Sequence, residues 1–145
     1  MCNFLSAVIF RNGDLLYDPE HSDSHEDLLQ AAHVRDGFCQ IDRFARVEFV
    51  PPEDRTKLFD LKQWTLKIDE ESQPEWLDLD RLRADLSARV AAMMIQTGEH
   101  DLLLGGCWII GGDAVIKRVK SSRIVAVCGS AQIHNVRGSA QIHGV

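Results

Sequence analysis

The sequence lacks any long hydrophobic run, and this excludes a membrane-spanning helix. Among its 145 residues, no apolar stretch approaches the roughly 20 residues that such a helix needs. The first ten residues, MCNFLSAVIF, also lack the basic segment and the small-residue cleavage site of a secretory signal peptide. We therefore expect neither a membrane partner nor a secreted protein.

Cysteine is scarce, and motifs for metals, phosphates or cofactors are missing. The cysteines are far apart and form no CxxC pair: they are Cys2, Cys39, Cys107 and Cys128. Without a secretory signal, we expect free buried thiols rather than disulfides. The sequence contains no HExxH or DxDxDG motif, and its glycines match neither GxGxxG nor GxxxxGK[ST]. We therefore expect no metal and no cofactor.

Basic residues are outnumbered by acidic ones. The chain has 16 Lys and Arg against 22 Asp and Glu, which gives a net charge of −6. This balance argues against a nucleic-acid partner, because non-specific binding to phosphates needs a basic surface. A chain of this length can bury a core of its own, so we expect one domain with a short appendage.

Residue periodicity predicts an α+β domain over residues 1–104, with an antiparallel sheet and two helices. Strands are expected at 4–10, 14–17, 43–50 and 63–68, followed by a strand-like run from 102 through CWII, and helices at about 24–33 and 75–96. Asn12-Gly13 is typical of a type I′ hairpin turn, in which both central residues have positive φ. Ser24 and Asp27 form a capping-box-like pair.

The strand at 43–50 alternates between apolar and charged residues. We expect Phe44, Val47 and Phe49 on one side, and Arg46 and Glu48 on the other.

Residues 112–145 repeat a short pattern. The units are GDAVIKRV, KSSRIVAVC, GSAQIHNVR and GSAQIHGV. Their alignment gives three columns on one strand face, which are Ala114, Ser122, Ala131 and Ala140; Ile116, Ile124, Ile133 and Ile142; and Val119, Val127, Val136 and Val145. A β-solenoid or an antiparallel meander fits this pattern. The identity of equivalent positions favours a solenoid-like tail over residues 105–145.

The last unit ends without a polar cap, and an exposed strand edge is a template for further pairing. We therefore expect a homo-oligomer formed through residues 112–145. Its expected interface residues are Ile133, Val136, Ile142 and Val145.

Histidines repeat in one outward column of the tail, at His134 and His143. A metal or phosphate site would use them. A solvated polar column explains them better, because the equivalent position in an earlier unit is Val125.

Four residues are candidates for ligand binding. His25 and Glu26 lie at the start of the first predicted helix, and Arg46 lies on the polar side of the strand at 43–50. Trp76 follows Pro74 in a polar stretch, so we expect its ring to be exposed. His21 and His25 are four residues apart, but the serines between them resemble a helix cap, which favours a charged first turn over a metal site.

Cys2 is a candidate nucleophile. After removal of Met1 its own α-amino group could act as the base, as in N-terminal nucleophile enzymes. No oxyanion-hole motif accompanies it, and packing at the start of the first strand is the simpler explanation. An amidohydrolase activity at Cys2 is therefore an alternative, and a non-enzymatic protein is the main expectation.

The segments SAVIFRNGDLLYDPEHSDSHEDLL, RVEFVPP, WTLKIDEESQPEW and GCWIIGGDAVIKRV, with the GSAQIH units, resemble small proteins encoded by bacteriophages and prophages. In that family a similar N-terminal domain precedes a variable number of G-N/S-A-type repeats. The resemblance covers nearly the whole chain, and it carries over no catalytic residue. It implies a phage accessory protein in the bacterial cytoplasm.

The resemblance and the open repeat edge together indicate a non-enzymatic, oligomeric binding protein. Its expected task is to neutralise a host factor, either by sequestering a nucleotide signal or by blocking a defence protein. A structural virion protein that assembles through its β-helix is a further alternative.

Overall fold

The computed structural model describes residues 4–22, 24–33 and 43–142. The chain divides into two compact units, one of residues 1–53 and 60–87 and the other of residues 54–59 and 88–145. Five residues named above lie outside the described residues: Met1, Cys2, Cys39, His143 and Val145. No helix in the described part of the chain is long and apolar enough to cross a membrane.

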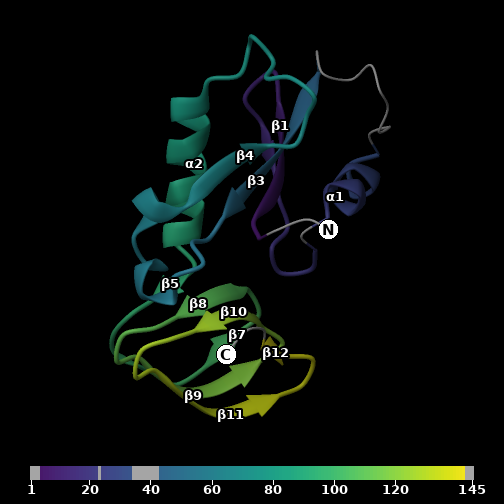
Figure 1. Ribbon diagram of the computed structural model, residues 1–145. Coiled ribbons are helices and arrows are strands. Elements are labelled where there is room, and N and C mark those ends of the chain that lie inside the picture. The colour runs from purple at the N-terminus through teal and green to yellow at the C-terminus, as the bar shows by residue number, and fades with distance from the viewer. Residues whose placement is uncertain (1–3, 23, 34–42, 143–145) are drawn as a thin grey trace. The chain divides into compact units, whose positions relative to one another are not determined.

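The first unit contains an antiparallel sheet with a helix on each face (Figure 1). The strands pair in the order β2-β1-β3-β4, and they are β1 (Ser6–Phe10), β2 (Leu15–Leu16), β3 (Phe44–Val50) and β4 (Thr65–Ile68). The helices are α1 (His25–Ala31) and α2 (Leu79–Ala91), with the short 3-10 turn η2 (Leu61–Gln63), while the 3-10 turn η1 (Arg55–Lys57) belongs to the second unit. The prediction of an α+β protein with two helices and an antiparallel sheet is confirmed.

The hairpin between β1 and β2 forms where Asn12-Gly13 predicted it, but with a different turn. Among the described residues, the only non-glycine residues with positive φ are His33 and Ser121. Asn12 therefore does not adopt a type I′ conformation, and Gly13 alone has the positive φ, at 95°. Its N–H donates to the Phe10 carbonyl oxygen at 2.9 Å, which is typical of a three-residue loop with glycine in the left-handed position.

Strand β3 is buried on both faces because a helix covers each one. On one face Phe49 lies beneath α2, whose Arg83 guanidinium carbon is 5.5 Å from the ring centroid. On the other face Phe44 joins a buried cluster of residues from β1 and α1, namely Val8, Leu28 and Leu29. The prediction that Phe44 shares a face with Phe49 is wrong, because positions an odd number apart alternate sides. Glu48 shares the face of Phe44.

Helix α2 ends earlier than predicted, at Ala91. Met94 and Ile95 form strand β5 (Met94–Ile95), which pairs in parallel with β8 (Cys107–Ile110). The Ile109 N–H donates to the Met93 carbonyl oxygen at 2.9 Å. The predicted helix at 75–96 is therefore cut short, because its last residues pair with a distant strand.

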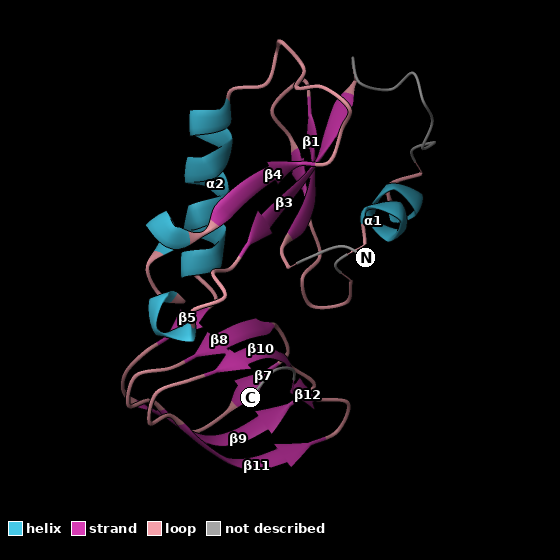
Figure 2. Ribbon diagram, in the orientation of Figure 1, coloured by secondary structure: helices cyan, strands magenta, loops and turns pink. Residues whose placement is uncertain are grey.

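The second unit is built from strands that all pair in parallel, and strands dominate its ribbon (Figure 2). One sheet has the order β12-β10-β8-β5, and it adds β10 (Arg123–Val127) and β12 (Gln141–Ile142). The other has the order β11-β9-β6, with β7 also paired to β9, and its strands are β6 (Glu99–His100), β7 (Leu103–Leu104), β9 (Val115–Lys120) and β11 (Gln132–Arg137).

Pairing in the second unit joins every second repeat. Ile116 pairs with Ile133 in one sheet, and Ile124 pairs with Ile142 in the other. Because neighbouring strands run parallel, the antiparallel meander is excluded for the described strands. Like residues stack on like, as the aligned columns predicted.

The columns of small residues, isoleucines and valines line the core of the second unit. The first two repeat units supply buried residues to one cluster, namely Ala114, Ile116, Val119 and Ile124. Burial then falls along the tail: Val136 is 45% exposed and Ile142 is 39% exposed. The columns are therefore buried in the first two units, apart from the half-buried Val127, and exposed at these outer positions, since β11 and β12 lie last in their sheets.

Candidate functional site

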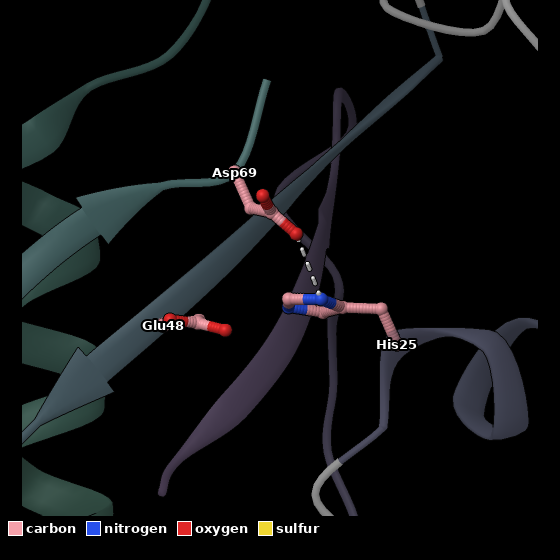
Figure 3. A group of neighbouring side chains, drawn as sticks. All are labelled: His25, Glu48 and Asp69. Atoms are coloured by element: carbon pink, nitrogen blue, oxygen red, sulfur yellow. Dashed lines mark ion pairs between the residues drawn. The ribbon is translucent and has the colours of Figure 1, made fainter. Parts of the chain in front are cut away.

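A cluster of polar side chains lies beneath α1 in the first unit, and we call it the polar cluster (Figure 3). His25 is the first residue of α1, Glu48 belongs to β3, and Asp69 directly follows β4. One imidazole nitrogen and one oxygen from each carboxylate lie within 4.8 Å of one another. Three separate elements of the chain therefore bring possible metal ligands together.

The start of α1 explains why His25 points inward. The Ser24 hydroxyl oxygen accepts the Asp27 N–H at 3.4 Å, which caps the helix and confirms the predicted start. His25 then lies three and four residues before Leu28 and Leu29, so the three side chains share one face. Both leucines are buried, and His25 is only 4% exposed.

The backbone of β3 sets the orientation of the His25 ring. Its Nε2 atom lies 2.8 Å from the carbonyl oxygen of Val47. A carbonyl oxygen only accepts hydrogen bonds, so Nε2 carries a proton and donates it. In the neutral ring Nδ1 therefore holds the lone pair, and it lies 3.4 Å from Asp69 Oδ2.

Beside the polar cluster, Arg46 and Glu70 form a bidentate ion pair. Arg46 Nε lies 2.9 Å from Glu70 Oε1, and Nη2 lies 3.0 Å from Oε2. Burial of the Glu70 carboxyl disfavours its charge, but the side-chain and backbone hydrogen bonds from Arg46 outweigh burial, so the pKa of Glu70 lies below its usual value. The Asp69 N–H donates to the Arg46 carbonyl oxygen at 2.9 Å, which joins this pair to the polar cluster.

The structure brings only part of the predicted ligand-binding set together. His25 belongs to the polar cluster and Arg46 lies next to it, whereas Glu26 is exposed on α1. Trp76 is half-buried rather than exposed, and it lines a separate hollow of about 120 Å³. Sequence reasoning did not select Glu48 or Asp69 as site residues.

The outer face of β9 and β11 carries a second, larger hollow of about 560 Å³, whose lining includes Lys117, Arg118 and His134. The Lys117 ammonium pairs with Glu99 and, at 3.1 Å, with Asp101. Hydrogen bonds to Glu99 and Asp101 raise the pKa of Lys117. These carboxylates engage Lys117, and the Arg118 Nε donates to the Asp101 carbonyl oxygen at 3.3 Å, so the face does not resemble a phosphate site.

The outermost strands of the second unit form an open edge, which we call the outer edge (β11 and β12). Among the described residues, β11 pairs only with β9 and β12 only with β10. Val136 and Ile142 lie on these strands and are exposed. One strand further in, Val119 and Ile124 are 1% and 0% exposed.

Of the cysteines in the described ranges, Cys107 and Cys128 form no disulfide. Cys107 is buried, and burial raises the pKa of the half-buried Cys128 thiol. Neither thiol therefore has the environment of an activated nucleophile.

Comparison of the chain with models of protein families, with curated proteins and with solved structures finds no match. The two features above are therefore interpreted from their own chemistry. The outer edge offers main-chain hydrogen bonds and apolar side chains, which suit another strand. The polar cluster offers one imidazole and two carboxylates.

Proposed function

We propose that this chain is a non-enzymatic binding protein that forms a homo-oligomer through its repeat strands. The observation that carries the proposal is the outer edge, where apolar residues of the repeat columns lie exposed on strands with one described neighbour. We also propose that residues 105–145 form a short β-solenoid.

Four observations support the solenoid. The strands alternate between two parallel sheets, every second repeat unit pairs, and the core cluster draws on both sheets. Glycines with positive φ stand near the unit starts, at Gly112, Gly129 and Gly138. A coil that bends once per unit and changes sheet at each bend accounts for all of these features.

The proposed occupant of the outer edge is a second copy of the chain. Within the chain, β11 already lies on β9 with Ile133 on Ile116 and Val136 on Val119. Strand β11 carries Ile133 and Val136, and among the described strands none pairs with its far side. Inside the molecule, repeat strands pair in parallel with like residues opposite each other. A second copy of the chain supplies a strand that can pair with β11 in the same way.

The proposed role follows from the resemblance to phage-encoded proteins: the oligomer acts in the bacterial cytoplasm and neutralises a host factor. A protein target is better supported than a nucleotide signal. The hollow beside Trp76, at about 120 Å³, is small against the roughly 300–1,000 Å³ of typical ligand pockets. In the larger hollow, Lys117 pairs with the carboxylates of Glu99 and Asp101, and Arg118 donates to the Asp101 carbonyl oxygen.

Light scattering coupled to size-exclusion chromatography tests the assembly. The wild-type chain is expected to elute as an oligomer, and Val136→Lys as a monomer, because a charge at the outer edge opposes pairing. Leu104→Lys is the matched control: Leu104 is 67% exposed on β7, on the other side of β9 from β11. That variant should remain oligomeric.

A wild-type chain that stays monomeric up to high concentration would overturn the proposal of an oligomer.

Titration calorimetry with a cyclic dinucleotide distinguishes a protein target from a nucleotide target. No heat of binding is expected, and stoichiometric binding would replace the protein target with a nucleotide one.

A further inference from the structure

We infer that His25, Glu48 and Asp69 form a binding site for a divalent transition-metal ion. The inference is independent of the proposed oligomeric function, since it rests on the first unit alone. The ligand set mixes one imidazole with two carboxylates, and Zn²⁺ and Mn²⁺ accept such donors. Mg²⁺ and Ca²⁺ prefer oxygen ligands alone, so the imidazole selects against them.

The orientation of His25 is that of a metal-ligating histidine. Such residues donate one ring N–H to a carbonyl or carboxylate, and this fixes the tautomer and directs the other nitrogen at the ion. Here Nε2 donates to the Val47 carbonyl oxygen at 2.8 Å, and Nδ1 is left facing the carboxylates. The backbone of β3 therefore supplies the second-sphere contact before any ion binds.

The spacing of the donor atoms also fits an ion. Ligand atoms bound at about 2.1 Å with tetrahedral angles lie about 3.4 Å from each other. His25 Nδ1 and Asp69 Oδ2 are 3.4 Å apart. The donor atoms of all three residues lie within 4.8 Å of one another, which is close to the separation that a shared ion requires.

Charge and burial favour a cation at this point. Glu48 and Asp69 together supply two negative charges, while the nearby charge of Glu70 is engaged by Arg46. Glu48 is 8% exposed and His25 is 4% exposed, so water screens their attraction for a cation only weakly. The Asp69 side chain is 58% exposed, which gives the ion an entry path and room for a water ligand.

Equilibrium titration of the full chain with Zn²⁺ and with Mn²⁺ tests the inference. We expect one tight site per chain, and Asp69→Asn and Glu48→Gln should each weaken binding by at least about tenfold. Glu26→Gln is the matched control, because Glu26 is an exposed carboxylate next to His25 in the sequence. That variant should bind the ion as the wild type does.

A spectroscopic readout excludes binding by the cysteines. Co²⁺ loaded into the same site should give the visible bands of nitrogen and oxygen ligands, without the near-ultraviolet band of a cobalt–thiolate bond. Circular dichroism and melting without metal show whether each variant is folded. Because the Asp69 side chain is exposed, Asp69→Asn should disturb the fold less than Glu48→Gln does.

Two results would overturn the inference. One is stoichiometric binding that Asp69→Asn and Glu48→Gln leave unchanged, which would place the ion elsewhere. The other is no binding by the wild type together with a lower melting temperature for Asp69→Asn, which is the result expected of a plain ion pair between His25 and Asp69.

Discussion

Several polar side chains in this protein donate hydrogen bonds to backbone carbonyl oxygens rather than to other side chains. His25 donates to the Val47 carbonyl oxygen, and Arg83 donates to that of Trp64 at 2.6 Å. In the second unit, the buried Ser122 hydroxyl donates to the Gly105 carbonyl oxygen at 2.7 Å. Buried polar groups need such partners, because an unsatisfied donor costs free energy in a low dielectric.

The ion pair of Arg46 and Glu70 makes stability depend on pH. The pKa of Glu70 is lower in the folded protein than the usual 4.5, so the pair stabilises the fold above that value and loses its contribution as pH falls through the folded pKa. Glu70→Gln should lower the free energy of unfolding by about 1 kcal/mol at pH 7, and the difference should vanish once the pH is below the folded pKa of Glu70.

Urea unfolding of both proteins over a series of pH values measures this effect. Glu71→Gln, at the exposed neighbouring position, should match the wild type throughout. A Glu70→Gln difference that stays constant from neutral to acidic pH would contradict the assignment.

At the scale of elements, close backbone approaches shape the bends between repeat strands. Gly112 has φ of 58°, and a Cβ atom there would overlap the carbonyl oxygen of Gln96. Gly138 has a similar φ of 69°, but the nearest atom to its Cβ position is the Ser121 hydroxyl oxygen at 3.4 Å. The two glycines share a backbone conformation and differ in the space around them.

Substitution of Gly112 and Gly138 by alanine should separate the cost of the backbone conformation from the cost of steric overlap. Gly138→Ala should cost about 1 kcal/mol, from the left-handed conformation alone. Gly112→Ala should cost about 3 kcal/mol or more, because its new methyl group meets a backbone atom that cannot easily move. Chemical denaturation measures both, and equal losses would show that the contact with Gln96 is unimportant.

At the scale of the whole molecule, burial in the second unit falls from the inner strands to the outer edge. Ile116 is fully buried, whereas Val136 is 45% exposed. In a stack of strands each layer covers the one before it, so the last layer stays exposed until something covers it. The proposal of a second copy at the outer edge follows from this arrangement.

If the chain forms an oligomer through the outer edge, its melting temperature depends on the protein concentration. The melting temperature of the wild type should rise by about 3 °C for each tenfold increase in protein concentration. The melting temperature of Val136→Lys should not change with concentration, because its folded monomer has no partner to lose. Calorimetric scans at several concentrations measure both, and a constant wild-type melting temperature would argue against a stable oligomer.

Local patterns predicted most elements of the fold. The hairpin at Asn12-Gly13 and the cap at Ser24 depend on residues a few positions apart, and the repeat columns depend on the recurrence of one pattern from unit to unit. The predictions failed where a distant segment decided the outcome. Met94 became a strand because it pairs with Ile109, and no local pattern contains that partner.

The polar cluster was only partly predictable for the same reason. His25 stood out at the start of a helix, and its spacing from Leu28 and Leu29 could have shown that it faces inward. Glu48 looked like a solvated residue on the polar side of a strand, since nothing nearby in the sequence indicates that α1 covers that face. Asp69 follows a different strand and gave no signal of its own.

The sequence by itself determined the periodicities of this protein: two helices, an alternating central strand and repeat units that stack like on like. These follow from backbone geometry, which acts over a few residues. Only the tertiary structure decided that both faces of β3 are covered, that His25 meets Glu48 and Asp69, and that the outer edge is left with one described neighbour. Those outcomes depend on which distant surfaces pack together, and burial of apolar area selects them for the molecule as a whole.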